Sequence, residues 1–182
     1  MSIEYWEIDR LRTRIHFAVR HLVFSKTRGR FSRSSGTVKI PDGDFSRATV
    51  DVVIDATSID TGVARRDEHL RSADYLDVSR HPHIAFTSHR VVAEPDGRLR
   101  VVGALTIRNV TREVTLAVEP GGSTRDSWGL ERARFSAVTA IDRRDFGFTG
   151  NTALDSGGVV IGERIDVEIE VEAVRQPAAR AA

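Results

Sequence analysis

The chain has 182 residues, with 27 basic and 26 acidic side chains and a formal net charge of +1. This balance argues against a nucleic-acid-binding face, and the lack of cysteine excludes disulfides and thiolate metal ligands. Because no Pro/Gly/Ser-rich linker divides the chain, we expect a single domain over residues 1–175, followed by a flexible tail at 176–182.

The N-terminal residues do not have the basic segment and apolar core of a secretory signal. No apolar run reaches the roughly 18–20 residues that a membrane-spanning helix needs. We therefore expect a cytoplasmic protein that makes no stable membrane insertion.

Alternation of apolar and polar residues predicts β-strands along most of the chain. In the most regular case, Ile165, Val167, Ile169 and Val171 alternate with acidic residues, which is typical of an antiparallel strand with one face in water. In chain order, we expect strands over residues 15–19, 31–40, 50–55, 84–92, 99–107, 114–118, 135–141 and 165–172.

Two pieces of the chain break this strand pattern. One lies near residues 22–28, and the other, longer and crowded with charge, covers residues 58–82. Asp67 is placed to cap a short helical turn that ends at Ser72, so we expect a helical excursion around residues 60–76. Prolines and glycines predict turns between strands at 41–44, 95–97 and 120–122.

About eight strands separated mainly by tight turns predict an all-β meander. Closure into an eight-stranded antiparallel barrel would leave no exposed edge. A barrel of this size is either filled by its own side chains or holds one small ligand. The chain has only two tryptophans and one methionine, so little bulk is available to plug the interior, and an apolar guest is favoured.

Charged and aromatic residues gather in two places that we expect at the barrel rim. Arg66, Asp67 and His69 either contact the polar head of a ligand or form an ordinary capped turn with solvated charges. Leu70, next to them, is expected to pack over the barrel opening.

The second place is the segment Asp142-Arg-Arg-Asp-Phe-Gly147, which is followed by Phe148. It either puts a charge pair beside aromatic rings that contact a ligand, or forms a salt-bridged bulge in which Gly147 supplies unusual dihedrals. The two interpretations are compatible.

Metal binding and catalysis have weak support. His81 and His83 lack further ligands nearby, and Pro82 fixes an extended path that separates them, so we expect no metal. The sequence contains neither a Gly-x-Ser-x-Gly elbow nor a glycine-rich phosphate loop. Asp67 and His69 are two residues apart, which on a short turn does not present them as a relay. We therefore expect a protein that is not an enzyme and has no cofactor.

Several motifs occur in a fixed order along nearly the whole chain, from Trp6 to about Val174. They are Trp6-x-Ile8-Asp9, Arg14-Ile-His-Phe17, Ser58-Ile-Asp-Thr-Gly62 with Arg66-Asp-x-His-Leu-Arg-Ser72, His81-Pro-x-Ile84-x-Phe86, Gly103-x-Leu-Thr-Ile107 and Arg143-x-Asp-Phe-Gly147. Together they resemble the YceI-like family, the bacterial polyisoprenoid-binding proteins with a lipocalin-like barrel.

This resemblance implies a lipocalin-like barrel that binds a long-chain apolar lipid for sequestration, storage or transport. A polyisoprenoid or isoprenoid quinone is the expected ligand. Fatty acids or fatty amides, an enzyme acting on a hydrophobic substrate, and a filled barrel that serves as a binding partner or stress protein are the alternatives. A homodimer would shield the open mouths of two barrels.

The expected ligand-binding residues divide into an apolar lining and a polar rim. The rim residues are Arg66, Asp67, His69 and Arg143, of which the arginines would favour an anionic head group. The lining and lid residues are Phe17, Val19, Phe24, Phe31, Leu70, Tyr75, Leu76, Ile84, Phe86, Phe135, Phe146 and Phe148.

Overall fold

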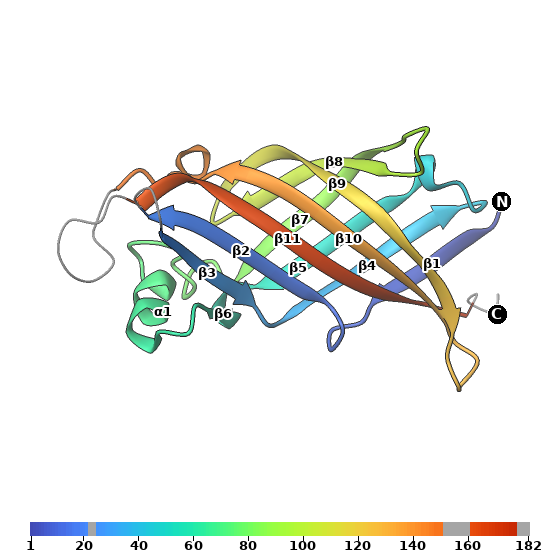
Figure 1. Cartoon of the computed structure of the whole chain (residues 1–182), viewed down its shortest axis with the longest axis horizontal. Helices are drawn as coiled ribbons and strands as arrows, with labels where there is room; N and C mark the ends of the chain where they lie inside the picture. Colours follow the sequence, from blue (N-terminus) through green and yellow to red (C-terminus); the bar gives the residue numbers. More distant parts are fainter. Residues whose placement is uncertain (22–24, 151–160, 178–182) are drawn as a thin grey trace.

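The computed structural model describes residues 1–21, 25–150 and 161–177, which form a closed antiparallel β-barrel with one short helix (Figure 1). The expectation of an all-β barrel is confirmed. The described strands are β1 (Ile3–Ile8), β2 (Arg14–His21), β3 (Ser25–Phe31), β4 (Ser34–Pro41), β5 (Thr49–Asp55), β6 (Ile59–Asp60), β7 (His83–Ala93), β8 (Leu99–Ile107), β9 (Val110–Arg125), β10 (Glu131–Asp142) and β11 (Ile161–Arg175). The helix is α1 (Ala64–Arg71), and the 3-10 turns are η1 (Phe45–Arg47), η2 (Ala56–Ser58) and η3 (Arg143–Phe146).

The barrel has eight staves because three of them are each built from two strand segments. β1 and β2 both pair with β11, one after the other along its length. β3 and β4 likewise follow one another along the next stave, and β5 and β6 along the third. The ring closes at β1, where Trp6 stands opposite Val38 of β4 on one side and Arg175 of β11 on the other.

Several expectations about the strands are wrong. The strand expected over residues 31–40 is divided between the end of β3 and β4, and β1 was not expected. Residues 25–28, expected outside the strands, begin β3, which pairs with β2 along its whole length. Residues 120–122, expected as a turn, lie inside β9, where the register against β10 shifts between Ala133 and Phe135. Pro120 and the two glycines after it therefore belong to a β-bulge, and the chain reverses later, around Gly129.

The helical excursion is present, but Asp67 does not cap it. The helix α1 begins at Ala64, four residues earlier than a cap at Asp67 would place it, and its N-cap residue Val63 makes no side-chain hydrogen bond to it. Asp67 is instead buried inside the helix and bonds backward to Thr61. The Asp67 carboxylate accepts its hydrogen bonds from Thr61, in the loop before the helix, and not from the amides of the first helical turn.

The apolar residues that alternate along the staves point inward and form two clusters. One, near the chain termini, is built around Trp6, Ile40 and Phe86. The other, at the end of the barrel that carries α1, is built around Ile59, Ile84 and Phe146. Residues of both clusters also line an internal cavity, so side chains do not fill the whole interior of the barrel.

A four-membered ion cluster ties the staves together near the ring closure. The Arg132 guanidinium on β10 donates to carboxylates of Asp9 at 2.8 Å, Asp126 at 2.9 Å and Glu172 at 2.9 Å. Asp9 follows β1, Asp126 starts the β9–β10 hairpin, and Glu172 lies on β11. One side chain therefore links three separate parts of the chain.

The cluster shifts the pKa values of its carboxyl groups. Burial alone would raise the pKa of Asp9 and of Glu172. Hydrogen bonds from Arg132 and from the Leu11 amide hold the pKa of Asp9 below its ordinary value, and hydrogen bonds from Arg12 and Arg132 do the same for the pKa of Glu172. The hydrogen bond from Arg132 likewise lowers the pKa of Asp126. Carboxyl groups whose pKa is lowered on folding stabilise the fold above their unfolded pKa, and this stabilisation is lost as the pH falls.

We expect Arg132→Gln to lower the thermal midpoint at pH 7 by on the order of 5 °C, because it leaves carboxylates without their cation. The difference from the unchanged protein should shrink as the pH falls through about 4, where the carboxyl groups take up protons. Thermal unfolding followed by circular dichroism between pH 7 and pH 3 measures this. Arg98→Gln is the matched control, because Arg98 pairs only with exposed acids. A gap that stays constant with pH would contradict the assigned ion pairs.

Candidate functional site

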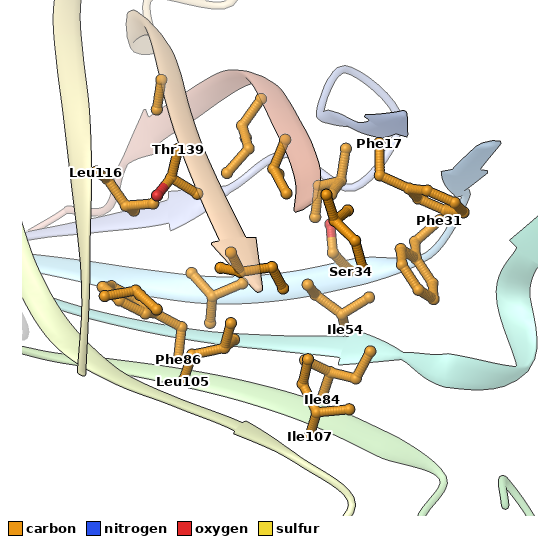
Figure 2. A pocket seen from close by; sticks show the side chains of 18 of the residues that line it. Phe17, Phe31, Ser34, Ile54, Ile84, Phe86, Leu105, Ile107, Leu116 and Thr139 are labelled. Carbon is orange, nitrogen blue, oxygen red and sulfur yellow. The ribbon is translucent and has the colours of Figure 1, made fainter. Parts of the chain in front are cut away.

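An elongated apolar cavity of about 350 Å³ runs through the barrel (Figure 2). On β11 alone its lining residues extend from Ile161 to Val171, which is about 33 Å of strand and, at the usual tilt, about 25 Å of barrel axis. The lining is almost entirely apolar along that length. The shape of the cavity therefore matches a long hydrocarbon.

The lining residues are the inward-facing positions of every stave. Ile165, Val167 and Ile169 are only half-buried although they point inward, because they face the empty space. Figure 2 shows Ile54, Ile84, Phe86, Leu105 and Ile107 directed into the same space from neighbouring staves.

Two of the aromatic rings in the cavity lie against glycines. Phe17 stands opposite Gly29 on β3, and a Cβ atom added at Gly29 would collide with its ring. A Cβ at Gly103 would lie 2.6 Å from the ring of Phe86. Glycine thus lets each ring lie close to the barrel wall, which keeps the lumen open.

Most of the expected ligand-binding residues come together around this cavity. His69, Asp67 and Phe146 are absent from its lining within the described residues, and Phe24 lies outside the described residues. The expected residues that do line it are Phe17, Val19, Phe31, Arg66, Leu70, Tyr75, Leu76, Ile84, Phe86, Phe135, Arg143 and Phe148.

Phe146, expected at the rim, is instead fully buried under η3, in the cluster that also holds Ile59 and Ile107. Because η3 turns back on Gly147, which has a φ of 87°, Phe146 and Phe148 are directed to different places. Only Phe148 reaches the cavity, and this separation depends on the glycine.

At the α1 end, Arg66 and Asp67 both hold Thr61. The Arg66 guanidinium donates to the Thr61 hydroxyl at 2.8 Å and to its carbonyl at 2.9 Å. The Asp67 carboxylate accepts from the Thr61 amide at 2.8 Å and from its hydroxyl at 2.5 Å. Arg66 and Thr61 border the cavity, while Asp67 supports them from behind. Arg66 is therefore a cation fixed at the rim.

His69 also stands behind the lining. Its ring meets Tyr75 edge-on at 5.1 Å, and its Nε2 lies 3.1 Å from the Asp74 carboxylate. Tyr75 in turn stacks on Phe148 with ring centroids 6.4 Å apart. His69 thus orients one of the two rings that narrow this end of the cavity.

Arg108 joins the same group and was missed by the sequence reasoning. It donates to the Tyr75 carbonyl at 2.8 Å, and its guanidinium lies 5.2 Å from the Phe148 ring centroid. Its φ of 56° is unusual for a residue with a side chain and places Arg108 in the β8–β9 turn. A long-range contact made from a turn leaves no signal in the local sequence.

Arg143 is buried, and its guanidinium bonds to backbone carbonyls both after η3 and at the start of β11. It donates to carbonyls of Gly162 and Gly150, each at 3.0 Å, and also to Phe148. It joins η3 to the start of β11 while bordering the cavity. Arg143 thus brings a second cation to the α1 end.

Asp67 and His69 lie on the same helix but are engaged separately. Asp67 and His69 have different partners, Thr61 and Asp74, and share no hydrogen bond. No group of three or more His, Cys, Asp or Glu residues in the described ranges could hold a metal ion. The arrangement can bind and shield an apolar molecule.

Within the described part of the chain, no helix has the length and apolar character needed to cross a bilayer.

Comparisons with known proteins agree with this geometry. The family model described as YceI-like domain matches residues 6–173. A protein named YceI from Escherichia coli O157:H7 is 37% identical over 162 residues, covering 89% of this chain and 81% of that protein. The solved YceI protein of Campylobacter jejuni matches with a TM-score of 0.72 at 28% identity, covering 87% of this chain and 90% of that one.

A polyisoprenoid binding domain from Saccharophagus degradans, implicated in plant cell wall breakdown, has the same fold. It matches with a TM-score of 0.68 at 19% identity, over 92% of this chain and 97% of that one.

We expect Gly29→Ala to push the Phe17 ring into the lumen, which should cost about 1–3 kcal/mol of stability and weaken uptake of a fluorescent long-chain fatty acid. The double variant Gly29→Ala/Phe17→Leu should recover both, because leucine leaves space for the new methyl group. Urea unfolding and a fluorescence titration measure the two effects. A single variant as stable and as active in uptake as the unchanged protein would show that the ring does not rest on Gly29.

Proposed function

Since the chain belongs to the YceI-like domain family, we propose that its barrel binds the hydrocarbon chain of a polyisoprenoid or isoprenoid quinone, for sequestration, storage or transport. The observation that carries this proposal is the long apolar cavity that runs through the barrel and is lined by residues of both core clusters. The neighbouring structure of a polyisoprenoid binding domain supports this ligand class.

The affinity would come from the chain of the ligand. Each methylene moved from water into the lumen contributes about 0.8 kcal/mol, which is about a fourfold gain in affinity. This gain continues until the lumen is filled. The lining thus selects for chain length and width, and it is indifferent to the chemistry of a head group held outside it.

The head group would lie at the α1 end. Arg66 and Arg143 border the cavity there, and Tyr75 and Phe148 narrow the passage between them and the lumen. Guanidinium groups suit a phosphate or another oxygen-rich head. A fatty acid or fatty amide would occupy the same lumen with its head in the same place, and is the alternative ligand class.

The proposal assigns no chemical step to the protein. The side chains expected for a catalytic reading, Asp67 and His69, are engaged in holding Thr61 and Tyr75 in place. Their proposed role is to support the rim.

The test of lipid binding replaces a small lining residue by a large one, so that the new side chain occupies the lumen. Ala137 is a buried lining residue on β10, and Ala117 is exposed on the outer face of the neighbouring β9. We expect Ala137→Trp to remove at least nine-tenths of the lipid that co-purifies with the unchanged protein, because the indole takes its space. Ala117→Trp, the matched control, should retain it. Mass spectrometry of organic extracts from detergent-free protein gives the amount and identity of the lipid.

A second variant, Phe86→Asp, tests the same lumen by polarity, provided that circular dichroism shows it folded. The identity of the extracted lipid decides between an isoprenoid and a fatty acid derivative. An empty extract, together with no uptake of added polyprenol, quinone or fatty acid by folded protein, would refute the proposal.

A further inference from the structure

Two loops project from the same side of the barrel and carry large apolar side chains into solvent (Figure 1). The loop between β1 and β2 exposes Leu11 at 96%, and the β9–β10 hairpin exposes Trp128 at 80% and Leu130 at 40%. Large apolar side chains exposed on two loops that share one anchor at Arg132 are a candidate contact surface. We call residues 10–12 and 125–130 the two-loop surface.

Both loops are bonded, through Asp9 and Asp126, to the guanidinium of Arg132. One Asp9 oxygen accepts from the Leu11 amide at 3.0 Å, while the other accepts from Arg132 at 2.8 Å. One Asp126 oxygen accepts from the amides of Trp128 and Leu130, each at 2.9 Å, while the other accepts from Arg132 at 2.9 Å. Each turn is thus tied to a shared anchor, and little conformational freedom would be lost on docking.

The charge that faces outward from these loops is positive. The carboxylates of Asp9 and Asp126 are turned toward Arg132. Arg10 and Arg125 remain exposed on the same two loops, and Arg10 has no ion-pair partner among the described residues. Tryptophan and leucine flanked by arginine are the residues that an anionic bilayer interface accepts.

The β1–β2 loop is also part of the cavity wall. Its flanking residues Ile8 and Thr13 both line the cavity. Opposite it, only Val171 and Glu172 of β11 separate the partners of Ile8 and Arg14, and the Asp9 amide donates to the Glu172 carbonyl at 2.8 Å, so the loop bulges outward from an almost continuous ladder. Within the described residues, the Thr13 hydroxyl is also the buried side-chain oxygen that lacks a hydrogen-bond partner.

We propose that the two-loop surface docks the barrel reversibly onto an anionic lipid bilayer, with Leu11, Trp128 and Leu130 entering the interfacial region and Arg10 and Arg125 contacting the head groups. The choice of a bilayer over a protein partner rests in part on the proposed function, because a long-chain isoprenoid is stored in membranes. Docking places the bilayer against the stretch of wall formed by Ile8 and Thr13.

The experiment uses the full chain and vesicles of phosphatidylcholine with 25% phosphatidylglycerol, beside vesicles of phosphatidylcholine alone. Flotation gives the bound fraction, and tryptophan emission reports insertion. The chain has two tryptophans, and Trp6 is buried, so a blue shift on binding would arise from Trp128. We expect binding to the anionic vesicles with a blue shift, and weaker binding to the neutral ones.

The double variant Leu11→Ser/Trp128→Ser should bind the anionic vesicles at least tenfold more weakly. The matched control is Val53→Ser/Val138→Ser, which removes two exposed apolar side chains from the barrel wall and should bind like the unchanged protein. Arg10→Glu should weaken binding to anionic vesicles only. The thermal midpoint of each variant confirms folding, since all these side chains are exposed.

Three outcomes would overturn the proposal: no vesicle binding by the unchanged protein, equal binding by the Leu11→Ser/Trp128→Ser variant, or equal loss in the Val53→Ser/Val138→Ser control. A concentration-dependent dimer that the loop variant abolishes, without vesicle binding, would assign the surface to self-association and equally overturn it. Lipid extraction from the loop variant separates the two proposals, because a filled lumen with lost docking leaves the proposed function intact.

Discussion

The closure of the hydrogen-bonded ladder at β1 is the constraint on which the rest of the structure depends. β1 bonds β4 on one side and β11 on the other, which closes the ring; among the described strands, an unpaired edge is left at the α1 end, where β3 from Ser25 to Gly29 pairs with β2 alone. A sheet of eight staves curled into a ring fixes which face of every strand points inward. The apolar residues of all staves must then share one interior, and the length of β9, β10 and β11 makes that interior longer than its side chains can fill.

The two ends of the barrel differ in where they place polar and apolar side chains. At the α1 end, cations and aromatic rings are held by partners outside the lumen: Thr61 fixes Arg66, and Arg108 and His69 fix the Tyr75–Phe148 pair. Toward the termini, Arg132 gathers three carboxylates, and the apolar tips of two loops remain in solvent. One end is therefore built from polar groups turned toward the cavity mouth, and the other from apolar groups turned away from the protein.

The alternation of apolar and polar residues was enough to predict the barrel and most of its lining. In a closed sheet, alternate residues of each strand point to the inside and to the outside. The prediction failed where the sequence does not alternate between apolar and polar residues. Residues 25–28 are polar or basic on both faces, so β3 was recognised only from its pairing with β2. Pro120 and its glycines have turn chemistry, yet a bulge uses the same residues without reversing the chain.

The site shows the same division. Phe17, Phe86 and Phe135 could be placed in the lumen from the strand pattern, whereas Phe146 could not be distinguished from Phe148 without the turn at Gly147. Arg108 and Arg132 act on residues 33 and 123 positions away, at Tyr75 and Asp9. Contacts at such separations depend on how the staves meet, and no local pattern encodes them.

The cavity inside the barrel also makes the stability of the protein sensitive to hydrostatic pressure. Hydrostatic pressure favours whichever state occupies less volume, and unfolding removes internal voids by letting water reach their walls. A barrel with about 350 Å³ of dry lumen should therefore be soft under compression when empty. A guest that fills the lumen cancels that volume, so the pressure at which the barrel collapses becomes a direct gauge of how much of its length is occupied.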